Sequence, residues 1–365
     1  MFRVGAGDNG RQRIGAGWSE AELMLLRALL ACWVLGMGMT FTSRAQAPDS
    51  IQLKPEVEAF VTKMVVQHRF REDYLRGIFS QLRSHEGVVK AIGAPSTAKP
   101  WHEFRKTFVT PTRTTGGVSF WTENADALKR ARDIYGIPEE VIVSIIGVET
   151  IYGRRTGGFR VIEAIYTLAF EMTERAEFFR SEMEQYLLLT RENGFDPLEV
   201  KGSFAGALGV PQFIPSSYRR YAVDFDGDGK IDLWNSNTDA IGSVANFLNH
   251  FGWVSGQTIT TLARVNDANV QEVLDAGFKP NWTVEQMQAK GVEPMENIGP
   301  ETQAGLFALD SGRGPEYWLA LNNLYVITRY NRSRNYAMAV FQLAQAIARE
   351  KAGLPPLQAG SVATQ

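Results

Sequence analysis

The sequence predicts a mainly α-helical protein of the α+β class, with a small β element late in the chain. Apolar residues recur at helical spacing through most of the chain after residue 55, and strand-like segments are confined to about 305–325. The chain has 365 residues, 44% of them hydrophobic, which is typical of a soluble globular protein with a substantial core. One large domain or two small ones would fit.

The charge balance argues against a nucleic-acid partner. The chain has 38 Lys and Arg residues against 40 Asp and Glu residues, for a net charge of −2. Binding a polyphosphate needs a concentrated basic face, which this balance does not support. The four histidines are dispersed without the paired spacing of a zinc site. No organic cofactor is expected.

The first 47 residues are predicted to be an export signal. The run 28–41 is apolar and follows Arg27, and Ala45-Gln46-Ala47 has the pattern of a signal-peptidase site. The run is shorter than the roughly 20 residues of a membrane span, and an N-terminal anchor is the alternative. Lipidation of Cys32, the only cysteine, is a second alternative, although the apolar run continues past it.

The first half of the chain is predicted to form three helices. Helical spacing extends over 56–82 and 123–135. A third helix is expected from Pro138 to Tyr152, because Pro near the first helical position and acids in the first turn signal a helix start. A loop-rich stretch is predicted from about 93 to 119, where several helix breakers occur: Pro95, Pro100, Pro111, Gly116 and Gly117.

The second half is predicted to contain helices over 167–192, 238–250 and 334–351. The span 257–304 mixes short helical pieces with turns. Two strands are expected, 305–310 and 317–325, around the turn Ser311-Gly312-Arg313-Gly314. The residues after 352 are predicted to form a flexible tail.

Glu149 ends a run of aliphatic residues in the third predicted helix. The residues three, four and seven positions before it are Ile146, Ile145 and Ile142, so its carboxylate lies on the buried stripe. Burial favours the neutral carboxyl and raises its pKa, as a general acid working near neutral pH requires. A purely structural Glu, satisfied by hydrogen bonds or by an Arg such as Arg175, is the alternative.

The segment 224–232 reproduces the first nine positions of a calcium loop. Asp224, Asp226 and Asp228 occupy positions 1, 3 and 5, and Lys230 contributes its backbone carbonyl at position 7. Position 12 is Asn235, where a bidentate Glu is expected, so the standard loop does not close. An acidic turn without a metal is the alternative.

Longer motifs reveal a family resemblance. They are GVETIYG around Glu149, GSFAGALGVPQFIPSSYRRYAVDFDGDGKIDLW at 202–234, AIGSVANFLNHFGW at 240–253 and ITRYNRSRNYAMAVFQLAQAIA at 327–348. With them the chain closely resembles the lytic murein transglycosylase B family of Gram-negative bacteria, from about residue 55 to 350.

The resemblance implies how the chain is organised. A lysozyme-like catalytic core is expected, with an additional helical lobe, the small β element and an EF-hand-like loop. The catalytic region would span 48–352, with core motifs in 137–253 and 325–350, accessory lobes at about 55–100 and 257–320, and a tail at 353–365. The family loop ends on an Asp before the next helix, so Asp239 is the implied closing ligand of a structural Ca²⁺.

The resemblance also implies a reaction and its residues. The β-1,4 bond between N-acetylmuramic acid and N-acetylglucosamine of peptidoglycan would be cleaved without water, with Glu149 as acid and then base. Ser203, Gln212, Tyr330 and Tyr336 match positions that line the sugar cleft, as does Arg175. A periplasmic monomer is expected, with peptidoglycan strands and cell-wall synthesis enzymes as partners. A hydrolytic lysozyme and a non-catalytic murein-binding scaffold are the alternatives.

Overall fold

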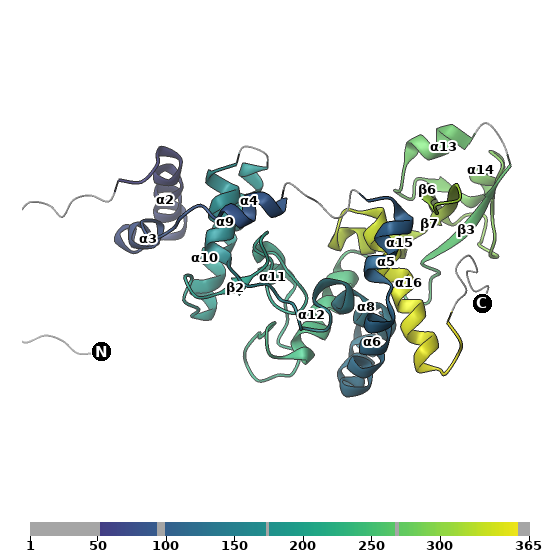
Figure 1. The fold of residues 1–365 in the computed structure, drawn as a ribbon, viewed down its shortest axis with the longest axis horizontal. Coiled ribbons are helices and arrows are strands. Elements are labelled where there is room, and N and C mark those ends of the chain that lie inside the picture. The colour runs from purple at the N-terminus through teal and green to yellow at the C-terminus, as the bar shows by residue number, and fades with distance from the viewer. Residues whose placement is uncertain (1–51, 93–98, 173–174, 267–269, 357–365) are drawn as a thin grey trace, which may run out of the picture. The chain divides into compact units, whose positions relative to one another are not determined.

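The computed structural model describes residues 52–92, 99–172, 175–266 and 270–356 (Figure 1). The predicted export signal, Cys32 and the end of the predicted tail lie outside the described residues. The mainly helical prediction is confirmed: helices dominate the described chain, and strands are few. None of the described helices is long and apolar enough to cross a membrane.

The first predicted helix, 56–82, is wrong as a single element. It is divided into α2 (Pro55–His68) and α3 (Glu72–Phe79), followed by α4 (Glu86–Ile92). Arg69 takes the left-handed conformation at φ 56° and its N–H donates to the carbonyl of Val65, which ends α2. The apolar spacing continued through this break and concealed it.

The loop-rich prediction for 93–119 is also wrong for most of its length. Residues 93–98 lie outside the description, but α5 (Trp101–Phe108) and α6 (Pro111–Glu123) fill the rest, and α7 (Ala125–Tyr135) follows as predicted. Pro111 occupies the first turn of α6, where its missing N–H costs nothing. The glycines inside α6 are explained by packing: a Cβ on Gly117 would lie 2.7 Å from the hydroxyl oxygen of Tyr152.

The helix α8 (Glu139–Thr150) lies at the centre of the core. Figure 1 shows α6 and α16 (Arg334–Lys351) beside it, and both pack against it. The predictions for α8 and α16 are confirmed, as is α12 (Asn237–His250). In α8 the residues Val141 to Val148 are all buried, so nearly the whole surface of this helix is covered.

The predicted helix 167–192 corresponds to the end of one helix and most of another. These are α9 (Val161–Phe170) and α10 (Ala176–Asn193), and Arg175 at φ 60° begins the second. The short strands β1 (Phe159–Arg160) and β2 (Lys201–Gly202) pair antiparallel, and α11 (Pro215–Tyr221) follows.

The β element is larger than predicted. It is an antiparallel sheet of order β4-β6-β7-β3-β5, with its own small apolar core. Its strands are β3 (Thr260–Val265), β4 (Trp282–Thr283), β5 (Val292–Pro294), β6 (Gln303–Asp310) and β7 (Pro315–Ala320), and α13 (Gln271–Ala276) and α14 (Val284–Gln288) lie between them. The predicted strand 317–325 extends too far, because residues 322–330 form α15 (Asn322–Tyr330).

Candidate active site

The candidate catalytic acid, Glu149, is the penultimate residue of α8, and its side chain is only partly exposed. The Tyr336 hydroxyl, on α16, donates a hydrogen bond to Glu149 Oε1 over 2.6 Å. Tyr336 itself is 3% exposed. The alternative of a structural ion pair with Arg175 has no support in the geometry, because the guanidinium of Arg175 lies over the rings of Phe178 and Phe179.

Burial raises the pKa of Glu149 to about 7, and the hydrogen bond from Tyr336 opposes this rise only in part. The direction predicted from the apolar stripe is therefore confirmed. No carboxylate in the described part of the chain contributes to the shift. The pKa of Tyr336 is itself raised well above its usual value, by burial and by the Glu149 carboxylate, so Tyr336 remains a proton donor in this bond.

The backbone after Glu149 turns sharply. Ile151 and Tyr152 both take left-handed conformations, with φ of 52° and 59°, which are uncommon for residues with a side chain. The Tyr152 hydroxyl donates to the carbonyl of Arg113, and Arg113 Nε donates to the carbonyl of Gly147. These contacts hold the end of α8 against α6.

The loop 202–213 carries the two polar residues expected in the cleft. Ser203 Oγ accepts hydrogen bonds from the backbone N–H groups of Ala205 and Ala207. Gln212 Nε2 donates to the carbonyls of Thr156 and Gly209. Neither the Ser203 O–H nor the Gln212 Oε1 forms a hydrogen bond with residues that the structure describes, so each side chain retains one group for a ligand.

Two side chains fix this loop to the segments that carry Glu149 and its partner Tyr336. Thr150, the neighbour of Glu149, donates from Oγ1 to the carbonyl of Val210 over 2.9 Å. The Tyr330 hydroxyl donates to the carbonyl of Pro211, and the Tyr330 ring stacks with the Tyr336 ring at 6.4 Å and 10°. The roles of Thr150, Tyr152 and Arg113 were not predicted. For Thr150 the only available signal was a small polar residue beside the acid.

The acidic loop brings three carboxylates together. One oxygen each from Asp224, Asp226 and Asp239 lies within 4.8 Å of the others. Asp239 is 1% exposed and accepts N–H donors from Phe225, Asp226 and Asp232, so it closes the loop from α12. Asp228 is outside this group; its carboxylate accepts the N–H of Lys230. Clustered carboxylate oxygens suit Ca²⁺, which prefers oxygen ligands.

Comparison with known proteins agrees with this geometry. The family described as Transglycosylase SLT domain matches residues 52–345. The membrane-bound lytic murein transglycosylase B of Escherichia coli (strain K12) is 46% identical over 304 residues, covering 80% of this chain and 83% of that protein.

Two solved structures are also similar. The Escherichia coli lytic transglycosylase Slt35 in complex with calcium is 44% identical, with a TM-score of 0.74, covering 82% of this chain and 94% of that one. SltB3 of Pseudomonas aeruginosa in complex with NAG-NAM-pentapeptide is 29% identical, with a TM-score of 0.70, covering 82% and 80%. The resemblance seen in the sequence is therefore confirmed, and the chain belongs to the transglycosylase SLT domain family of lytic murein transglycosylases.

Proposed function

We propose that this lytic transglycosylase cleaves the β-1,4 bond between N-acetylmuramic acid and N-acetylglucosamine in peptidoglycan, with Glu149 as its single acid and base. The observation that carries the proposal is the partly buried carboxyl of Glu149, with a pKa of about 7 and one hydrogen bond from Tyr336. A group with this pKa is protonated in a large fraction of molecules at neutral pH. It can therefore give a proton and later take one.

The reaction needs no water. Protonated Glu149 gives its proton to the glycosidic oxygen as the bond from that oxygen to the anomeric carbon breaks. The Glu149 carboxylate then takes the proton of the substrate's C6 hydroxyl, whose oxygen bonds to the anomeric carbon and closes a 1,6-anhydro ring. Glycosidases that use water normally need a second carboxylate, and none in the described chain contributes to the pKa of Glu149.

Ser203 and Gln212 are assigned to orient the N-acetyl group of the muramoyl sugar. Their side chains are held by the backbone, with the Ser203 O–H and the Gln212 Oε1 left for ligands. The N-acetyl oxygen then assists at the anomeric carbon. Tyr330 and Tyr336 are proposed to form the wall of the cleft beside Glu149, and Arg175 is proposed to contact the strand on the basis of the family resemblance. Undiminished turnover of a substrate without the N-acetyl group would contradict this assistance.

A structural Ca²⁺ is proposed in the acidic loop. Asp224, Asp226 and Asp239 would hold it, together with Asp228 and the Lys230 carbonyl. The ion would neutralise the clustered carboxylates and stabilise the loop that leads into α12, with no part in bond cleavage. The solved relative that is complexed with calcium supports this assignment.

The proposed location is the periplasm, reached by an export signal at residues 1–47. The Escherichia coli relative is described as membrane-bound, so attachment through Cys32 remains the alternative. Peptidoglycan strands are the proposed partner, as the complex of SltB3 with NAG-NAM-pentapeptide supports. Cell-wall synthesis enzymes are further proposed partners, and the protein is proposed to act as a monomer.

Mass spectrometry of the muropeptides released from purified sacculi tests the reaction, with Glu149→Gln as control. We expect products lighter by one water than their reducing counterparts, and none from Glu149→Gln. Reducing ends would instead identify a hydrolytic lysozyme. No product from either protein would favour the murein-binding scaffold.

A further inference from the structure

The hydroxyl of Thr150 joins the end of α8 to residues 202–213, which form the cleft loop. Thr150 is the last residue of α8 and is fully buried, at 0% exposure. Its Oγ1 donates to the carbonyl of Val210 over 2.9 Å and accepts the N–H of Gly153 over 3.0 Å. One buried hydroxyl therefore satisfies a carbonyl of the cleft loop and an N–H of the turn that follows Glu149.

The Thr150 hydroxyl has one proton and two carbonyls within reach. The carbonyl of Ile146, one turn earlier in α8, is the more distant, at 3.3 Å, and it also accepts the N–H of Tyr152. The carbonyl of Val210 is nearer and has no other hydrogen-bond donor in the part of the chain that the structure describes. Because an unpaired buried carbonyl costs free energy, the proton belongs to the bond with Val210.

Val210 is also held from its other side. Its N–H donates to the carbonyl of Leu233 over 2.7 Å. The segment after the acid packs closely against its side chain, since a Cβ on Gly153 would lie 3.3 Å from Val210 Cγ2. The peptide of Val210 is therefore a fixed point of the cleft loop, and its bond with Thr150 sets its place relative to α8.

Backbone hydrogen bonds make the cleft loop a single unit. The N–H of Ser203 donates to the carbonyl of Ala207, and Leu208 and Phe213 exchange two backbone hydrogen bonds. A shift at Val210 would therefore also move the hydroxyl of Ser203, which is assigned to the substrate.

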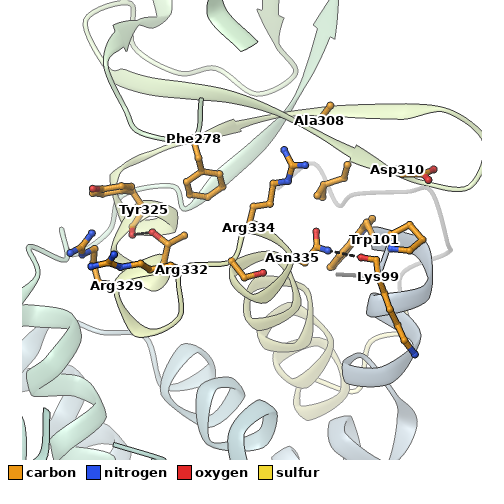
Figure 2. Close-up of a pocket in the computed structure, with 14 residues that line it drawn as sticks. Lys99, Trp101, Phe278, Ala308, Asp310, Tyr325, Arg329, Arg332, Arg334 and Asn335 are labelled. Carbon is orange, nitrogen blue, oxygen red and sulfur yellow. Dashed lines mark hydrogen bonds between the residues drawn. The ribbon is translucent and has the colours of Figure 1, made fainter. Parts of the chain in front are cut away.

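The hydrogen-bond partner of the acid is held separately. Tyr336 lies in the first turn of α16, and Asn335 Nδ2 donates to the carbonyl of Lys99 over 3.0 Å, which attaches the start of α16 to the residues before α5 (Figure 2). Neither bond involves the cleft loop. Among the described residues, the bond from Thr150 is the only hydrogen bond that joins α8 directly to this loop.

We propose that Thr150 is a positioning residue for the reaction: its hydroxyl sets the distance between the carboxyl of Glu149 and the sugar held by the cleft loop. The inference rests on the proposed function, because it takes Glu149 as the acid and the loop as a sugar-binding element. Proton transfer needs the two oxygen atoms within about 3.2 Å of each other. A misplacement of about 1 Å lowers the rate by roughly 100-fold.

Thr150→Val tests the inference, because it removes the hydroxyl and keeps the shape of the side chain. Its kcat is expected to fall about 10- to 100-fold with KM within about threefold of the wild type, since the strand still binds the loop but meets the acid at the wrong distance. Thr150→Ser keeps the hydroxyl and should recover most of the kcat. If Thr150→Val does not fold, Thr150→Ala, which also lacks the hydroxyl, gives the same comparison.

Thr190→Val is the matched control. Thr190 is buried near the end of α10 and donates to the carbonyl of Leu187 in its own helix, so kcat should stay at the wild-type value. The alkaline limb of the pH–rate profile should also stay in place in Thr150→Val, because Thr150 does not contribute to the pKa of Glu149. An equal loss of rate in Thr190→Val, or a moved limb in Thr150→Val, would overturn the positioning role.

The remaining outcomes separate this inference from the proposed function. A folded Thr150→Val enzyme with wild-type kcat, or a loss that Thr150→Ser does not recover, would refute the role of Thr150 and leave the proposed function standing. Reducing ends from the wild type would contradict the proposed reaction instead, and the comparison of rates would still decide the role of Thr150. If the wild type released no product, both would fail together.

Discussion

The proton of Glu149 links activity to stability. The folded-state pKa is about 7, against an ordinary value of 4.5, so the unfolded chain loses this proton first as the pH rises. Below pH 4.5 both states are protonated and the shift has no effect. Between pH 4.5 and 7 the free energy of unfolding falls, by an amount on the order of 3 kcal/mol in total.

Replacing Glu149 with Gln removes this titration and keeps an oxygen that accepts the hydrogen bond from Tyr336. The unfolding free energy of the wild type falls between pH 4 and pH 8, and that of the variant does not fall with it. We therefore expect the difference, variant minus wild type, to be about 3 kcal/mol larger at pH 8 than at pH 4. Urea unfolding at the two pH values measures this difference. A constant difference between the two proteins would mean that Glu149 titrates normally.

Removing the hydroxyl of Tyr336 should move the pH profile of the enzyme. The hydrogen bond that Tyr336 donates lowers the pKa of Glu149, in opposition to burial. In Tyr336→Phe the alkaline limb of kcat/KM should therefore move to higher pH, with a loss of about 10-fold or more in maximal rate. A pH–rate profile on solubilised strands measures both effects. If the alkaline limb stayed at the same pH in Tyr336→Phe, a group other than Glu149 would be responsible for it.

The candidate site was only partly predictable from the sequence. Glu149 stands out because three isoleucines share its face, and helical spacing alone places it there. Its partner Tyr336 is 187 positions away, and no local pattern joins the two; only the family resemblance indicated that Tyr336 faces the cleft. Thr150 and Arg113 act through backbone carbonyls, whose positions depend on the tertiary fold.

At the scale of elements, α6 depends on the absence of side chains at its glycines. A Cβ on Gly117 would lie 2.6 Å from Ile347 Cδ1 of α16 and 2.7 Å from the Tyr152 hydroxyl oxygen. Gly117→Ala is therefore expected to destabilise the protein by about 1–3 kcal/mol, since the packing has no room for the methyl group. It should also lower activity, because Tyr152 supports the end of α8.

Gly77→Ala is the matched control. Gly77 lies inside α3, and a Cβ there meets nothing within 4 Å. This change should stabilise the protein by about 0.5–1 kcal/mol, because Ala has less freedom to lose than Gly. Thermal unfolding of the two variants measures the contrast. Equal shifts of the unfolding temperature in the same direction would mean that α6 and α16 move apart easily enough to admit the extra methyl group at position 117.

The same glycines explain why α6 was not predicted. Pro111 and the pair Gly116-Gly117 resemble breakers in sequence, and only contact with Tyr152 makes them suitable for a helix. The strand β3 was missed because its partner β7 lies more than 50 residues later. By contrast α16 begins and ends as predicted, since its apolar spacing is regular and Ser333 caps its first turn.

At the scale of the whole molecule, the acidic loop is expected to affect the thermal stability of the protein but not its catalytic rate. Added Ca²⁺ is expected to raise the unfolding temperature and a chelator to lower it, because an ion that binds only the folded state stabilises it by mass action. Turnover at low temperature should remain after chelation. Calorimetry and a rate assay on the same samples separate these effects.

Asp226→Asn tests the loop with little disturbance of its hydrogen bonds. Asp226 accepts from the N–H of Asp228 and from the hydroxyl of Ser236, and an amide can form bonds with both groups. The variant should lose most of the Ca²⁺-dependent rise in unfolding temperature, since one carboxylate ligand is gone. Asp275→Asn, at an exposed acid of α13, should keep it. An unchanged calcium effect in Asp226→Asn would place the ion elsewhere.

The position of the acid within α8 has an electrostatic consequence. Glu149 is the penultimate residue of a twelve-residue helix, at the end where the aligned peptide dipoles place partial negative charge. A carboxylate is disfavoured there by about 0.3–1 kcal/mol, in the same direction as burial. The helix backbone thus helps to hold the proton on Glu149, and no substitution of a neighbouring side chain removes that contribution.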